Sequence, residues 1–228
     1  MDVVTITGWG QKVDALDNFA SSFGKVRNID YINLPGAEKF FAELKKYNKK
    51  CDILIGWSLG AQLAARAITA NIVNPKLLVL IAPPYQYVRG GKIKSGVHPF
   101  AFSFFKHAYE AFPGNTMREF GALVCQNDDH AMDIIATMDD DNTHHKGWIH
   151  WLGELEKFSC TSLDFSGFPR TLIFHGDGDE VTDAEQGKIF HKKIKNSRIE
   201  ILKHCGHAPH LHDPEFVIKV IKDELKKL

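Results

Sequence analysis

Residues 56–60 read GWSLG, which places a serine midway between two glycines. The run follows a short apolar stretch at residues 52–55 and precedes an alanine-rich stretch at residues 59–70, so it predicts a tight turn from a strand into a helix. Such a turn lifts the serine Oγ to the carboxyl edge of a sheet, and the glycines let the neighbouring backbone pass without Cβ clashes. We therefore predict that Ser58 is a nucleophile. A glycine-rich turn with a capping serine is the plain structural alternative.

A nucleophilic serine needs a histidine base and a carboxylate that orients it, in the chain order Ser, Asp, His for an open α/β sheet. Residues 175–179 read HGDGD and residues 205–209 read CGHAP, and each run follows a stretch with strand character. His207 is therefore the expected base. Asp177 and Asp179 compete for the orienting role. We assign it to Asp179, because Asp177 is better placed to stabilise the turn by an Asx-type hydrogen bond.

Acyl transfer also needs two backbone N–H groups that stabilise the developing negative oxygen. The residue after the nucleophile, Leu59, supplies one. Residues 8–10 read GWG and follow the first strand pattern, so the N–H of Trp9 is the candidate for the other. The alternative is a glycine turn that carries a packed tryptophan.

The histidines around residue 207 also permit a metal site as a rival interpretation. Its ligands would be His204, Cys205, His207 and His210, but their spacing matches no standard zinc pattern. We therefore expect no metal, and we expect His204, His210 and His212 to be surface or rim residues.

The elements that must position these residues alternate strands with helices over much of the chain, which is typical of a parallel sheet buried on both faces. Strand patterns occur at residues 3–7, 28–34, 52–55, 76–81, 170–175 and 197–202, and helical patterns at 14–23, 38–47, 59–70, 184–194 and 216–225. Residues 83–168 break this alternation, being aromatic, histidine-rich and helical in pieces. We predict an α/β fold whose core is residues 1–82 and 169–228, interrupted by a helical cap at residues 83–168.

Together, the GWG, GWSLG, HGDGD and GHAP runs resemble the α/β-hydrolase superfamily, and within it the pimeloyl-[acyl-carrier protein] methyl ester esterases of biotin synthesis. The resemblance implies Ser58, Asp179 and His207 as the catalytic set, and Trp9 and Leu59 as oxyanion and substrate contacts. It also implies that Phe120, in the run TMREF, lines an acyl channel. No metal or organic cofactor is implied, and an acyl-carrier protein is the implied partner.

Three departures from the family pattern are visible. Thr7 stands where the oxyanion motif usually has histidine, and because Trp9 would donate through its backbone, the chemistry is expected to survive. The one or two strands that usually precede this loop are not seen. The family's basic cap residues do not align one for one with those of the insertion, which are Arg89, Lys92, Lys94, Lys106 and Arg118.

Composition and charge exclude several classes of protein. Of the 228 residues, 28 are Lys or Arg and 28 are Asp or Glu, and this balance argues against a nucleic-acid-binding protein. We find no secretory signal pattern and no apolar stretch near the roughly 20 residues of a membrane span, so we expect a cytoplasmic monomer. The four cysteines are expected to be free thiols, and the acidic run at residues 139–141, beside His144 and His145, a solvated loop.

Three functions remain open at this point. The first is a serine carboxylesterase that hydrolyses the methyl ester of pimeloyl-[acyl-carrier protein]. The second is a general carboxylesterase or thioesterase for small acyl substrates, and the third is a non-catalytic α/β-hydrolase scaffold. An aromatic face at helical spacing, formed by Phe102, Phe105, Tyr109 and Phe112, is either a small core beneath the cap or an apolar channel for a medium-length acyl chain.

Overall fold

One parallel six-stranded sheet organises the protein, with its strands in the order β2-β1-β3-β4-β5-β6. The computed structural model describes residues 1–48 and 51–228, and of Asn142 the backbone alone. The strands are β1 (Asp2–Ile6), β2 (Lys25–Asn28), β3 (Ile53–Trp57), β4 (Leu77–Ile81), β5 (Arg170–Gly176) and β6 (Ser197–Leu202). The predicted α/β class, with a mostly parallel sheet, is confirmed.

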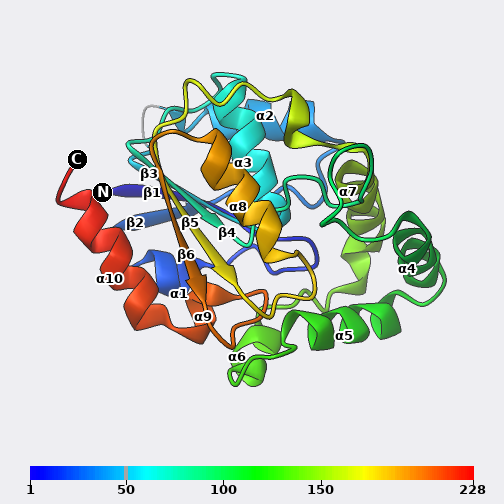
Figure 1. Cartoon of the computed structure of the whole chain (residues 1–228). Coiled ribbons are helices and arrows are strands. Elements are labelled where there is room, and N and C mark those ends of the chain that lie inside the picture. Colours follow the sequence, from blue (N-terminus) through cyan, green and yellow to red (C-terminus); the bar gives the residue numbers. More distant parts are fainter. Residues whose placement is uncertain (49–50) are drawn as a thin grey trace.

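Helices cover both faces of the sheet, as Figure 1 shows. On one face lie α2 (Ala37–Lys45), α3 (Leu59–Thr69) and α8 (Ala184–Lys193), and on the other α1 (Asp17–Ala20) and α10 (Pro214–Leu225), with the short α9 (Pro209–His212) leading into α10. All residues of β3 and β4 are buried, because both strands lie inside the sheet with a helical layer on each side. The central strands therefore form a rigid base for whatever their carboxyl ends carry.

Two predicted elements differ from the structure. The second strand is Lys25–Asn28 and not residues 28–34, because Tyr31 and Ile32 are buried by loop packing and not by strand pairing. The Tyr31 hydroxyl donates to the carbonyl of Thr7, and the Tyr31 carbonyl accepts from the indole of Trp151. An apolar run that packs as a loop cannot be told from a strand by composition. Similarly, the helix expected at residues 14–23 is reduced to α1, with turns on both sides.

Residues 83–168, which we call the inserted segment, lie between β4 and β5 and carry helices beside the carboxyl ends of the strands (Figure 1). These helices are α4 (Pro99–Ala111), α5 (Pro113–Val124), α6 (Ala131–Ala136) and α7 (His145–Lys157), with the 3-10 turns η2 (Asn142–His144) and η3 (Cys160–Ser162). Within the described residues, no helix is both long and apolar enough to cross a membrane.

Candidate active site

Ser58 occupies the turn between β3 and α3 with backbone angles of φ 54° and ψ −120°. A positive φ is unfavourable for a residue with a Cβ. Residues strained in this way cluster at functional sites, where the surrounding structure holds them in place. Here the Ser58 N–H donates to the carbonyl of Ile81 at 2.9 Å, which fixes the turn against the end of β4. The Ser58 side chain thus stands at the carboxyl edge of the sheet, next to the first turn of α3.

Close backbone approach explains two of the glycines around this serine. A Cβ on Gly60 would collide with the carbonyl oxygen of Ile6, so α3 packs directly on β1 only because position 60 has no side chain. A Cβ on Gly8 would lie 3.1 Å from the Cβ of Ser58, which places the GWG loop against the serine. The glycines of both motifs therefore bring the serine and the GWG loop into contact.

His207 and Asp179 form a buried pair at the same edge of the sheet. The His207 Nδ1–H donates to Asp179 Oδ2 at 2.8 Å, and both side chains are at most 1% exposed. His207 Nε2 is buried and has no hydrogen-bond partner among the described residues, so Ser58 and His207 are not hydrogen-bonded in this structure. Because Nδ1 carries the hydrogen, Nε2 is the nitrogen that can accept a proton.

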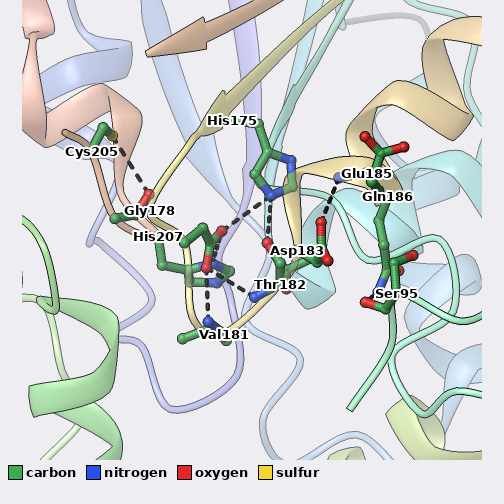
Figure 2. A network of polar contacts seen from close by, with 12 residues as sticks. Ser95, His175, Gly178, Val181, Thr182, Asp183, Glu185, Gln186, Cys205 and His207 are labelled. Carbon is green, nitrogen blue, oxygen red and sulfur yellow. Dashed lines mark hydrogen bonds and ion pairs between the residues drawn. The ribbon is translucent and has the colours of Figure 1, made fainter. Parts of the chain in front are cut away.

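Asp179 is held by three further contacts in the network of Figure 2. Its Oδ1 accepts from the N–H groups of Val181 and Thr182, each at 2.9 Å, and its Oδ2 lies 3.2 Å from Nε2 of His175. His175 Nε2–H also donates to the Thr182 carbonyl at 2.7 Å. Burial acts to raise the pKa of Asp179, but the charge of His207 and the hydrogen bonds from His175 and His207 outweigh it, so the pKa is lowered and the carboxyl stays ionised.

The structure distinguishes the two acids of the HGDGD run. Asp177 is exposed, and its Oδ1 accepts from the N–H of His204, so it joins the two loops without reaching His207. His175, which was not predicted as a site residue, is fully buried and lies against Asp179 Oδ2, whereas the backbone donors bind Oδ1. Its position four residues before Asp179, at the end of the strand, was the available signal.

Trp57, the residue before the nucleophile candidate, fixes the loop that carries His207. Its indole N–H donates to the His207 carbonyl at 2.8 Å, and its ring packs against His210 with 4.6 Å between centroids. The prediction that His210 is a surface or rim residue is wrong: the side chain is fully buried between Trp57 and Phe19. Burial, together with the nearby His207, lowers the pKa of His210 to about 3, so it is a neutral packing residue.

Trp9 lies at the centre of an aromatic cluster that joins the GWG loop to the inserted segment. Its ring makes edge contacts with Phe105, Tyr109, Phe120 and Trp148, with centroids 5.0 to 5.9 Å apart. Phe120 is 6% exposed and lies 5.0 Å from Trp9. Both alternatives for the aromatic face therefore stay open, since these rings pack together and also lie beside the GWG loop.

Phe112 does not join this cluster. It follows the last residue of α4 with φ −138°, so the helical spacing that put it on the aromatic face ends before it, and its side chain is 67% exposed.

Backbone pairing also ties the GWG loop to the inserted segment. The Asp139 N–H donates to the Gly10 carbonyl and the Lys12 N–H to the Thr137 carbonyl, each at 2.8 Å. The expectation of a solvated loop at residues 139–141 is wrong for Asp139, which is 7% exposed. Its Oδ2 accepts from the Trp148 indole at 2.8 Å and lies 2.7 Å from Nδ1 of His144.

A cavity of about 560 Å³ lies next to the aromatic cluster. Tyr109, Met117 and Trp148 line it together with Lys12 and Arg118. Met117 Sδ would lie 2.9 Å from a Cβ placed on Gly10, so a flexible methionine separates the GWG loop from this cavity. The cavity lining does not include Ser58 or His207.

The four residues of the rival metal interpretation do not form one cluster in the described structure. His204 is exposed, His207 is bound to Asp179, and His210 is buried against Trp57. Cys205 faces a different pair of side chains, Asp128 and His212.

Comparison with known families agrees with this geometry. Residues 6–220 match the model of the Alpha/beta hydrolase family. The chain belongs to the alpha/beta hydrolase family. The sheet order, the strained serine after β3 and the Asp–His pair after β5 and β6 are thus found in a chain of that family.

Curated relatives within this family include biotin-synthesis enzymes at low identity. The chain is 22% identical to the biotin biosynthesis bifunctional protein BioHC of Teredinibacter turnerae, covering 99% of this chain and 44% of that protein. It is 24% identical to the pimeloyl-[acyl-carrier protein] methyl ester esterase of Nitrosomonas europaea, over 94% of this chain and 91% of the relative. The chain thus spans less than half of the first relative and nearly all of the second.

A solved structure supports the hydrolase fold independently. An esterase from Exiguobacterium antarcticum superposes with a TM-score of 0.82 at 15% identity, covering 98% of this chain and 92% of the esterase. At this identity the likeness concerns the fold alone.

Proposed function

We propose that this alpha/beta hydrolase is a serine carboxylesterase that hydrolyses the methyl ester of pimeloyl-[acyl-carrier protein] in biotin synthesis. The observation that supports the chemistry is the buried Asp179–His207 pair, with His207 in a loop that Trp57 ties to the serine turn. Among the described residues, His207 Nε2 has no hydrogen-bond partner. The proposed substrate is the one in the name of the Nitrosomonas europaea relative. The reaction would take place in the cytoplasm.

In the proposed mechanism, Ser58 Oγ attacks the ester carbonyl carbon while His207 Nε2 takes the hydroxyl proton. The N–H groups of Trp9 and Leu59 stabilise the negative oxygen of the tetrahedral intermediate. Collapse of the intermediate breaks the ester C–O bond, and His207 returns the proton to the leaving methoxide, which departs as methanol. Water then attacks the carbonyl carbon of the acyl-serine and loses a proton to His207. As the bond between that carbon and Ser58 Oγ breaks, His207 returns the proton to Oγ, and the free carboxylic acid leaves.

Asp179 would keep the His207 ring in the tautomer that exposes Nε2. The lowered pKa of Asp179 fits this role, because an ionised carboxylate stabilises the imidazolium that forms during each proton transfer. The backbone donors Val181 and Thr182 hold the carboxylate in place, so the ring orientation is fixed before substrate arrives.

We propose that the inserted segment acts as a cap that receives the acyl chain. Phe120 and Phe105 lie against Trp9, so an apolar chain leaving the serine would run along aromatic rings. The exposed cations Arg89, Lys92 and Lys94 would then attract the acidic carrier protein, whereas Lys106 is already paired with Glu156 at 2.8 Å.

The test compares kcat/KM on pimeloyl-[acyl-carrier protein] methyl ester with that on p-nitrophenyl butyrate. Reversing Arg89, Lys92 and Lys94 to glutamate should slow turnover of the carrier-protein ester by about tenfold or more and leave the small ester unchanged, because charge steering acts on association. The matched control reverses three exposed lysines at the other edge of the sheet, Lys192, Lys193 and Lys195.

Each alternative function predicts a distinct outcome. Turnover of the small ester alone, with no cleavage of the carrier-protein ester, would indicate a general esterase or thioesterase. Absence of hydrolysis on both substrates would indicate a binding scaffold. Rescue of biotin prototrophy in a bacterium that lacks its own esterase of this type provides the matching test in the cell.

A further inference from the structure

Three potential metal ligands, one from the inserted segment and two from the region after β6, meet at the loop that carries His207. Asp128 lies between α5 and α6 of the inserted segment, Cys205 in the loop after β6, and His212 at the end of α9. One ligand atom from each, a carboxylate oxygen, the thiol sulfur and an imidazole nitrogen, lie within 4.8 Å of one another. This cluster is separate from the Asp179–His207 pair.

Burial makes this cluster unusual. The Asp128 carboxylate and Cys205 are fully buried, and the His212 side chain is 18% exposed. His212 Nδ1 is itself buried and 3.2 Å from Asp128 Oδ2, yet it makes no hydrogen bond among the described residues. A buried carboxylate is costly unless a cation or several good donors compensate it. Among the described residues, the hydrogen-bond donors to the Asp128 carboxylate are the backbone N–H groups of His130 and Gly206, the second at 3.4 Å.

We propose that Asp128, Cys205 and His212 bind one Zn²⁺ ion per chain. Thiolate, imidazole and carboxylate are the three ligand types that Zn²⁺ takes in proteins. Binding releases the thiol proton of Cys205 to solvent, so that two negative ligands and a neutral imidazole balance the two charges of the ion. Water occupies the fourth tetrahedral position, reached from the partly exposed side of His212.

The three ligands join the inserted segment to the His207 loop. The two already touch, since a Cβ on Gly206 would lie 2.5 Å from the Gln126 carbonyl and the His207 N–H points to the Val124 carbonyl at 3.4 Å. A bound ion adds three metal–ligand bonds at this contact, and one of its ligands, Cys205, is two residues from His207. We therefore assign it a stabilising role, because metal binding free energy adds to folding free energy when the site forms only in the folded chain.

The test titrates Zn²⁺ into the metal-free protein against a chromophoric chelator. We expect saturation at one ion per chain, an affinity that rises with pH, and a raised melting temperature. Co²⁺ in place of Zn²⁺ should give a thiolate-to-metal charge-transfer band, which reports on the cysteine directly.

Single variants assign the ligands. Cys205→Ser and His212→Gln should each weaken binding by at least as much as the roughly 10–100-fold that follows loss of an outer-shell partner. Cys160→Ser, at another fully buried cysteine, and His204→Gln, at an exposed neighbour of Cys205, are the matched controls and should bind as the wild type does.

Two outcomes would overturn the site. One is the lack of saturable binding at one ion per chain, which would leave Asp128 and His212 as an ordinary ion pair. The other is a wild-type Co²⁺ complex without the thiolate band, a measurement that needs no variant to fold. No ester is hydrolysed in these experiments, so the site and the proposed function stand or fall separately.

Discussion

The central strands of the sheet and the inserted segment differ in how much of their apolar surface is buried. Every residue of β3 and β4 is buried, whereas α4 leaves Phe100 75% and Phe104 70% exposed and buries only Phe102 and Tyr109. The sheet carries Ser58, Asp179 and His207 on loops that leave rigid strands. We therefore propose that the bond-breaking residues lie on the well-buried sheet and the substrate contacts on the more exposed inserted segment. Substitutions in the sheet should therefore affect all substrates, and substitutions in the inserted segment only some.

The largest effect is expected from Ser58→Ala. Loss of the proposed nucleophile should lower kcat for every ester by up to about 10⁶-fold, as in comparable triads. The measurement is hydrolysis of p-nitrophenyl esters together with labelling by a fluorophosphonate, and circular dichroism checks that the variant is folded. Unchanged hydrolysis by Ser58→Ala would contradict the proposal that the reaction takes place at Ser58, on the carboxyl edge of the sheet.

Substitution of the two acids in the HGDGD run should separate orientation from turn structure. Asp179→Asn should lower kcat by about 10⁴-fold, because an amide in place of the carboxylate favours the wrong histidine tautomer. Asp177→Asn should leave kcat nearly unchanged, since Asp177 bonds only to the N–H of His204 in the described contacts. The reverse ranking in a kcat measurement would mean that the wrong acid has been assigned.

A smaller and selective effect is expected at Phe120. Phe120→Leu removes an aromatic contact with Trp9, and kcat/KM for medium-chain esters should fall by about 10-fold or more. Turnover of p-nitrophenyl acetate should stay within about twofold, because its acyl chain is too short to reach the ring. The control is Phe104→Leu, at an exposed position of the same segment. Equal losses on both esters would show that Phe120 supports the Trp9 loop and not the acyl chain.

The smallest effect concerns pH and the pair that His144 forms with Asp139 within the inserted segment. The hydrogen bond with Asp139 raises the pKa of His144, against the opposing effect of burial. A histidine whose pKa is raised on folding adds stability that is complete below its unfolded value, about 6.5, and is lost as pH rises through the folded value.

His144→Gln should therefore cost less than about 1 kcal/mol of unfolding free energy below pH 6.5, and the difference from wild type should shrink toward pH 8. Urea unfolding at several pH values measures it, with His204→Gln as the exposed control. A difference that grows with pH would contradict the ion pair between His144 and Asp139.

Prediction from sequence succeeded where local patterns determine structure. The alternation of apolar strands and helices predicted the parallel sheet, since each strand pattern depends on neighbouring residues only. The GWSLG run predicted the strained serine turn because glycines at those spacings serve a backbone need.

Prediction failed where burial depends on residues far along the chain. His210 was predicted as a rim residue but is buried by contacts with Trp57 and Phe19. Asp139 was predicted to be solvated but accepts a hydrogen bond from the Trp148 indole. The contact of His175 with Asp179 depends on how the loop after β5 folds back. Asp128 and Cys205 are close in space although 77 positions separate them in the sequence. No periodicity within one segment records such contacts.

The pairing of the Gly10 carbonyl with the Asp139 N–H has a consequence for how the protein is made. A chain leaves the ribosome from its N-terminus, and domains fold as their residues emerge. The GWG loop is synthesised before its partners Asp139 and Trp148, which come more than a hundred residues later in the chain. Until those residues are synthesised, the loop lacks its hydrogen-bond partners in the inserted segment. The proposed oxyanion hole of a nascent chain would therefore be completed only after α7 has been released.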